Sequence, residues 1–357
     1  MSDTQKKWLF MGETFLISLV GGYCFYLLKT PIPWTLGPLF ATLLWQRVAK
    51  RNVSWSLSLR NLGLLVVGYS MGCFFTPESS ELIFNQLPFM LVVTTLTIGV
   101  SIVTAYITHR MIGTELISTI MGSLPGGIQQ MAVLCDDIPK VDLNIVTFMQ
   151  TTRLLATVFV VPFLAIHGFS DGTTSAANFS YTATLTDHWP YFLLGVPVMI
   201  FLATILRMPS PYLFGAVLST AFLITMGYEP PRLPSYISAL GQLCVGISIG
   251  VRIRPVPLPN WKQLSRYSLM GVAVLLLFSF LFAEMISLLQ PVSLVSAFLA
   301  TAPGGLAEMS ITAMGLQEDV AFVLAYQFFR VLFLLTVVAP LLKYLLVKRE
   351  KKIALRE

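Results

Sequence analysis

The stretch Gly122–Gly127 (GSLPGG) returns in the second half of the chain as Ala300–Gly305 (ATAPGG), 178 residues later in a chain of 357 (303 − 125 = 178). At the same offset Pro33–Gly37 (PWTLG) is echoed by Pro211–Gly215 (PYLFG). Similarity at one fixed offset of about half the chain length indicates a tandem duplication. Two copies of one unit, each with a Pro-Gly-Gly break, therefore organise the chain.

Further residues repeat on either side of the triplets. Before them, Gly68-x-x-x-Gly72 matches Gly246-x-x-x-Gly250, a spacing typical of close helix contacts in membranes. After them the offset becomes 177 (319 − 142 = 177) and pairs Asp142 with Asp319, Gln150 with Gln327 and Arg153 with Arg330. The duplication therefore extends to polar and charged residues as well as to glycines.

The composition indicates a membrane protein. Hydrophobic residues make up 55% of the chain, charged residues only 11%, and the mean hydropathy is +0.77. Apolar runs long enough to span a bilayer recur along the chain without the alternation of β-barrel strands. We therefore predict an all-α polytopic membrane protein. The net charge of +6 comes from short basic clusters between apolar runs, which set orientation, so no direct nucleic acid binding is predicted.

Ten apolar segments are predicted to be transmembrane helices. They lie at about 9–28, 33–46, 59–75, 87–108, 143–166, 188–206, 211–227, 236–251, 267–289 and 320–346. One further apolar segment in each half, near 116–134 and 293–314, contains the Pro-Gly-Gly triplet. Each half is thus predicted to hold about five helices and one broken segment.

Positive-inside counting predicts how the broken segments run. If they cross fully, the loop Arg252–Arg266, with four basic residues, faces outside, against the rule. If they enter and return, the two halves are inverted, and this loop and both termini are cytoplasmic. We favour the re-entrant topology, while discontinuous crossing helices stay open. The predicted organisation is a first membrane repeat at 1–170, an extracytoplasmic linker at 171–187, a second membrane repeat at 188–347 and a basic cytoplasmic tail at 348–357.

The triplets are the first candidates for a binding site. Proline lacks a backbone donor and interrupts a helix, and glycine leaves the backbone uncovered. At membrane depth the freed groups need protein, water or ligand as partners, so broken elements commonly line cavities. A simple kink for helix packing is the alternative. The predicted solute-binding residues are Ser123, Pro125, Gly126, Gly127, Gln130, Gln150, Arg153, Thr301, Pro303, Gly304, Gly305, Gln327 and Arg330.

The Gln-x-x-Arg pairs support two interpretations. Spacing i, i+3 places Gln150 with Arg153, and Gln327 with Arg330, on one helix face near the middle of a span. A charge there costs at least about 2.5 kcal/mol unless it has a partner or an aqueous cavity. The arginines either clamp an anionic group of a solute or hold backbone carbonyls of the broken segment.

Glu308 is the predicted coupling residue. It follows the second triplet, and Gln130 stands at the matching place in the first half (308 − 178 = 130). A carboxylate inside the membrane is by default a functional hypothesis. It would carry a coupling proton or a cation, or else pair structurally with Arg330.

Cofactor chemistry finds little support in the sequence. Four cysteines and three histidines are scattered without the spacing of a metal site. No metal, no cofactor and no enzymatic activity are therefore predicted.

The repeated blocks are similar to those of the membrane AbrB-duplication family. The resemblance rests on Leu36–Leu39 (LGPL), Gly122–Gly127 and Thr301–Gly305 (TAPGG), and it covers nearly the whole chain. Members carry names of gene-expression regulators or of ammonia monooxygenases, and the family is grouped with inverted-repeat cation/proton antiporters and anion transporters. It shares only a name with the small DNA-binding AbrB regulators. The resemblance supplies no defined catalytic residues.

These observations predict a secondary transporter in the inner membrane. The solute is expected to be small and anionic or zwitterionic, because two predicted intramembrane arginines outnumber one carboxylate, and transport is expected to be coupled to protons or a cation. The alternative is a membrane sensor that affects gene expression indirectly and transports nothing. The predicted partners are the solute and the lipid bilayer, with homodimer formation left open.

Overall fold

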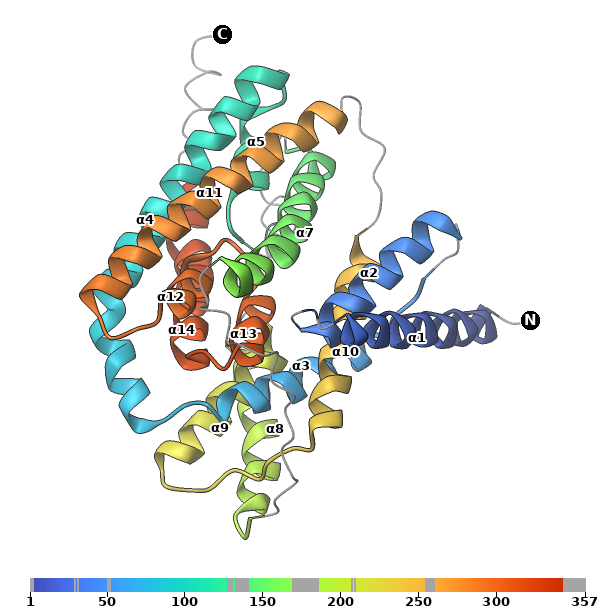
Figure 1. Ribbon diagram of the computed structural model, residues 1–357, viewed down its shortest axis with the longest axis vertical. Coiled ribbons are helices and arrows are strands. Elements are labelled where there is room, and N and C mark those ends of the chain that lie inside the picture. The colour runs from blue at the N-terminus through green and yellow to red at the C-terminus, as the bar shows by residue number, and fades with distance from the viewer. Residues whose placement is uncertain are drawn as a thin grey trace. The chain divides into compact units, whose positions relative to one another are not determined.

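The computed structural model describes residues 3–28, 30, 32–49, 53–126, 131, 141–168, 186–206, 208, 210–253 and 261–342. These residues form helices joined by turns (Figure 1). The all-α class predicted from composition is therefore confirmed. Gly127 and Gln130 lie outside the described residues, as do most of the predicted linker and the whole predicted basic tail.

The described helices vary in length from 8 to 36 residues. In the first half they are α1 (Asp3–Leu27), α2 (Pro33–Val48), α3 (Leu57–Gly72), α4 (Pro77–Ile112), α5 (Leu116–Ser123) and α7 (Leu143–His167). In the second half they are α8 (Trp189–Ile205), α9 (Pro211–Thr225), α10 (Ser235–Arg252), α11 (Trp261–Leu289), α12 (Leu294–Thr301), α13 (Leu306–Gly315) and α14 (Val320–Phe333), with a π-helical turn, η1, at Leu334–Val338. Nine of the ten predicted spans fall on one helix each, and the tenth, 320–346, covers α14 and η1 and ends outside the described residues.

In the described part of the chain, five helical stretches are long and apolar enough to cross a membrane. They are Trp8–Leu27, Asn85–Ile112, Leu143–His167, Trp261–Leu289 and Val320–Leu342. α8 and α9 are apolar but shorter. The structure thus describes a polytopic membrane protein, and the number and direction of the crossings stay predictions.

The chain divides into two compact units, and each takes residues from both sequence halves. Unit 1 contains 1–82, 162–255 and 310–321, and unit 2 contains 83–161, 256–309 and 322–357. The predicted repeat boundaries, which follow the sequence, are a separate division that contact clustering does not test.

Unit 1 is held together by the predicted glycine motifs. Cβ atoms placed on Gly68 and Gly72 of α3 would overlap α9, at the Leu213 carbonyl and at Thr220. The second motif, on α10, meets α2 in the same way, since Gly246 lies against the Thr35 carbonyl. The prediction of close helix contacts is therefore confirmed, with each motif packing on the proline-initiated helix of the other half.

The starts of those proline-initiated helices show the duplication in the backbone. Ile32 precedes Pro33 of α2 with φ 42°, and Ser210 precedes Pro211 of α9 with φ 49°. Residues other than glycine seldom adopt a left-handed conformation, which costs about 1–3 kcal/mol. The two residues are separated by the repeat offset (210 − 32 = 178). The repeats are therefore alike in an unusual local geometry as well as in sequence.

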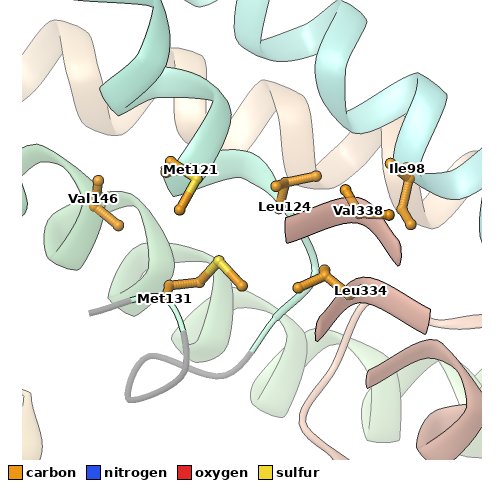
Figure 2. Packing of buried hydrophobic residues seen from close by; sticks show 7 residues of the cluster. All are labelled: Ile98, Met121, Leu124, Met131, Val146, Leu334 and Val338. Carbon is orange, nitrogen blue, oxygen red and sulfur yellow. The ribbon is translucent and has the colours of Figure 1, made fainter. Parts of the chain in front are cut away.

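Unit 2 contains the broken segments. In Figure 1 α11 runs back alongside α4, and a Cβ on Gly271 of α11 would lie 3.6 Å from the Cβ of Thr104 on α4. The Tyr326 hydroxyl of α14 donates to Gln86 Oε1 of α4 at 2.7 Å. Figure 2 shows an apolar cluster beside the first break, formed by Ile98, Met121, Leu124, Met131, Val146, Leu334 and Val338. This packing places the break between α4, α7 and η1.

Candidate functional site

The first broken segment begins where α5 stops. α5 ends at Ser123, and Leu124 and Pro125 follow with the backbone no longer helical. A Cβ on Gly126 would lie 2.5 Å from the end of the Met131 side chain, which would have to move. The break therefore exposes carbonyl groups inside the protein that no helix turn can satisfy.

Gln150 and Arg153 on α7 satisfy these carbonyls. The Gln150 side-chain amide donates to the carbonyls of Met121 and Leu124, both at 2.9 Å. The Arg153 guanidinium donates to the carbonyls of Leu124 and Gly126, the latter at 2.8 Å, and also to Gln150 Oε1 at 2.7 Å. A further contact to the Ser123 carbonyl is long, at 3.4 Å. The pair thus holds the broken backbone in place.

The second broken segment repeats this arrangement. α12 ends at Thr301, α13 starts at Leu306, and the Gln327 amide donates to the carbonyls of Leu299 and Ala302 at 2.8 and 3.1 Å. Its contact to the Ala300 carbonyl is longer, at 3.3 Å.

Arg330 completes the second clamp. It donates to the carbonyls of Ala302 and Gly304, at 2.7 and 2.8 Å, and to Gln327 Oε1. A Cβ on Gly304 would also lie 2.5 Å from Met309, which matches the first half (309 − 131 = 178). Both breaks are therefore built alike, atom for atom in their main contacts.

The backbone-holding role that the sequence left open for the arginines is thus present in both copies. The Nε–H of Arg153 and that of Arg330 are buried with no hydrogen-bond partner. Among the described residues, the terminal nitrogens of both side chains donate to backbone carbonyls and to a glutamine amide oxygen. Both arginines are therefore bound to the broken backbone inside unit 2.

The direction of α5 and α7 follows from these contacts. The Asp142 backbone N–H, at the start of α7, donates to the Ser118 hydroxyl in the first turn of α5 at 2.8 Å. Further along α7, Gln150 reaches Met121 and Arg153 reaches Gly126. The two helices therefore run the same way, and at Asp142 the chain is again level with the beginning of α5.

Glu308 lies in the first turn of α13 and is 9% exposed. A Cβ on Gly305 would overlap its carboxylate, so the carboxylate is folded back over the second triplet. A carboxylate in the first turn is favoured by the positive end of the helix dipole. Glu308 therefore belongs to the second break itself and does not stand apart from it.

Ser123 and Thr301, which occupy matched positions, differ in their surroundings. The Thr301 hydroxyl donates to the Ser279 carbonyl at 2.9 Å, and Ser279 Oγ contacts the Thr301 carbonyl at 3.1 Å, so α12 is tied to α11. Ser123 instead lines a small cavity beside Arg153. The two halves are therefore alike at the arginines and unlike at the hydroxyls.

The cavity has a volume of about 20 Å³, counted as the space that the centre of a water molecule can occupy. Four helices form its walls: α4 with Thr104 and Thr108, α5 with Gly122 and Ser123, α7 with Met149 and Arg153, and α11 with Tyr267, Ser268, Gly271, Val272 and Leu275. A space of this size holds one or two waters and no larger solute. Sequence reasoning missed the α4 and α11 walls, because isolated Thr, Ser and Gly in apolar helices gave no signal of convergence.

Metal ligands do not gather in the part of the chain that is described. There, no three His, Cys, Asp or Glu side chains lie close enough to hold an ion, and Cys24, Cys73 and Cys244 are not in disulfides. Of the predicted solute-binding residues, the structure brings Ser123, Gly126, Gln150 and Arg153 together at the first break. It brings Thr301, Gly304, Gln327 and Arg330 together at the second.

Comparison with known proteins agrees with the predicted family. Residues 34–346 match the family described as "Transition state regulatory protein AbrB". The chain is 25% identical over 351 residues to "Uncharacterized protein YhjN" of Bacillus subtilis (strain 168), covering 92% of this chain and 91% of the relative. It is 24% identical over 344 residues to "Putative regulator AbrB" of Escherichia coli (strain K12), covering 89% and 91%. Since the family match extends over most of the sequence, this helical membrane protein belongs to the AbrB family.

Proposed function

We propose that this protein is a secondary transporter of a small anionic or zwitterionic solute. The observation that carries the proposal is the matched pair of Gln–Arg clamps, which hold two broken backbones inside a unit of apolar helices. Maintaining two interrupted elements and two buried cations is costly in a membrane and is typical of a permeation site. The solute would bind to the exposed backbone of the breaks and to the arginines.

We propose further that the two halves are inverted and that the broken segments are re-entrant. The contact of Asp142 with Ser118 supports a first segment that leaves and returns on one side. In the second half, Gln327 reaches earlier carbonyls of α12 than Arg330 does, the same order as in the first. The equivalent helices α4 and α11 run in opposite directions in unit 2 (Figure 1). Inverted repeats with broken helices are a recurrent design of secondary transporters.

Glu308 is proposed to couple transport to a proton or cation. Its carboxylate covers the second triplet, and the matching residue of the first half, Gln130, cannot ionise. Binding or release of a proton there would change the charge beside the backbone that the solute needs. Coupling would thus be a property of one half only.

Reconstitution into liposomes tests this function. Small organic acids and amino acids, each radiolabelled, are offered to proteoliposomes with and without an imposed pH gradient, and protein-free liposomes are the control. We expect accumulation of at least one anionic or zwitterionic solute that increases with the gradient. Failure of every solute to exceed the control would refute the proposal.

A regulatory membrane protein without transport is the second candidate. It is favoured by the name of the Escherichia coli relative, "Putative regulator AbrB", and by the family description. That function predicts a ligand-dependent change in gene expression in cells that remains when flux in liposomes is absent. The two functions are separated by deleting the gene and expressing transport-inactive variants in its place. Such variants would restore the ligand-dependent gene expression if the protein is a sensor, but not if gene expression depends on transport. In either case we propose the cytoplasmic membrane as the location, with both termini inside.

A further inference from the structure

The cavity beside Arg153 differs from ordinary packing defects in its lining. Apolar voids in proteins stay dry, whereas this one is lined by five residues that carry hydroxyl groups: Thr104, Thr108, Tyr267, Ser268 and Ser123. The hydroxyls of Thr104 and Thr108 donate to carbonyls of their own helix, and Ser268 is only 6% exposed. The lining is therefore mixed, with polar residues beside the apolar side chains of Val272 and Leu275.

Arg153 gives the cavity a positive charge. The residue is 7% exposed, its two terminal nitrogens are occupied by the first break, and its Nε–H is buried without a partner. Because Nε is buried, a group in the cavity meets the charge of the guanidinium and not this N–H. A negatively charged group there would be attracted by that charge, which water and salt screen little inside the protein.

The second half shows that this polarity is not imposed by the architecture. At the repeat offset, Phe282 and Ile286 of α11 replace Thr104 and Thr108 of α4 (282 − 104 = 178). Thr301, in the place of Ser123, uses its hydroxyl to tie α12 to α11. The two arginines hold the breaks alike, and in the described part of the chain Arg153 lines this cavity while Arg330 does not.

We propose that this cavity is a binding site for a small anionic group, with Arg153 as the cation and Ser123 and Ser268 as hydroxyl donors. Its size admits a group no larger than one or two waters, such as a carboxylate. The inference rests on the proposed function in that the group would be the charged end of the transported solute. It places the charged end of the solute beside the first break and adds no further role for Arg330.

Formate is a suitable probe because it is the smallest carboxylate and carries no side chain. Full-length protein purified in detergent is titrated with sodium formate at constant ionic strength, with sodium gluconate replacing it, and the unfolding temperature is recorded. A ligand that binds only the folded state raises that temperature in a saturable way, from which an affinity follows. We expect saturation with formate and no response to bulky gluconate.

Two substitutions in the wall locate the site without disturbing the Arg153 clamp. Gly271→Ala adds a methyl group that only touches Thr104, at 3.6 Å, but narrows the cavity, and we expect formate affinity to fall about tenfold. Ser268→Ala removes one donor, and we expect a loss of about fivefold. Gly99→Ala, where a Cβ meets nothing within 4 Å, and Ser287→Ala, on an exposed part of α11, are the matched controls and should bind as the wild type does.

The outcomes separate this inference from the transport proposal. An unfolding temperature that responds equally to formate and gluconate, or wall variants that bind formate like the wild type, would overturn the cavity site. Solute flux would be untouched by that result. Saturable formate binding that the wall variants weaken, in a protein without any flux, would uphold the site while refuting transport.

Discussion

Arg153 and Arg330 show how single residues keep a broken element inside a membrane protein. Each guanidinium bonds to carbonyls on both sides of a proline, Leu124 and Gly126 in one case and Ala302 and Gly304 in the other. Backbone carbonyls left without donors in an apolar interior would favour another conformation. The arginines therefore act first as parts of the fold.

Removing one guanidinium should be strongly destabilising. Arg330→Gln leaves the Gly304 carbonyl without its donor and the Ala302 carbonyl with Gln327 alone, so we expect the free energy of unfolding to fall by about 3 kcal/mol or more. Thermal unfolding of the detergent-purified protein measures this change. Arg266→Gln, on an exposed part of α11, is the control and should shift stability by less than about 0.5 kcal/mol. A loss of under about 1 kcal/mol in Arg330→Gln would mean that the clamp is not structural.

The left-handed residue before Pro211 permits a second prediction at this scale. Ser210, at φ 49°, makes no side-chain capping bond, so its side chain contributes strain without a compensating contact. Ser210→Val should be less stable than Ser210→Gly by about 2 kcal/mol, since a β-branched residue is poorly tolerated there and glycine is not. Comparing the unfolding temperatures of the two variants measures it. Equal temperatures would show that the backbone relaxes elsewhere.

At the scale of elements, the sequence predicts the helices well and their partners only in part. Long apolar runs and initiating prolines place all ten predicted spans on helices, and the glycine motifs of α3 and α10 predict close contacts that are found. The hydroxyl-lined cavity was not predicted. Thr104 and Ser268 are far apart in sequence and meet only because α11 packs against α4. Such convergence depends on tertiary packing and leaves no local pattern.

The sequence predicts the contacts of the Gln–Arg clamps better than the cavity but less completely than the helices. The matched Gln-x-x-Arg pairs predict that each half binds a polar group through these side chains. Their spacing does not tell whether that group belongs to a solute or to the protein backbone. Which of the two is held is decided by where α5 and α12 end, and hence by the exposed carbonyls at residues 124–126 and 302–304. The sequence identifies the donor side chains, but the carbonyls that they bind are known only from the structure.

The parallel course of α5 and α7 predicts a cross-link. In a protein whose native cysteines are replaced, Ser118→Cys combined with Asp142→Cys should form a disulfide on mild oxidation, because the two residues are already joined by a hydrogen bond of 2.8 Å. Ser118→Cys with Val160→Cys is the control, since residue 160 lies about 27 Å further along α7 at 1.5 Å per residue. Cross-linking of the control pair alone would indicate that the first broken segment crosses the membrane.

At the scale of the whole molecule, two copies of one unit share particular features of local structure. They share the clamps, the left-handed residues before Pro33 and Pro211 and the methionines that lie against the glycines. The carboxylate of Glu308 belongs to the second half, whereas the cavity beside Arg153 is formed by helices of both halves. In the proposed transporter, a coupling residue at the second break and a solute-binding cavity at the first would link two bound species in a single transport cycle.

The central claim is most directly tested by pH-gradient-driven uptake into proteoliposomes, compared between the wild type and Glu308→Gln, which gives the second half the residue found in the first. The account predicts that the wild type accumulates a small anionic or zwitterionic solute above its external concentration. It predicts that Glu308→Gln exchanges that solute across the membrane without accumulating it. Accumulation by Glu308→Gln equal to that of the wild type would contradict the coupling role, and uptake by neither protein above protein-free liposomes would contradict transport itself.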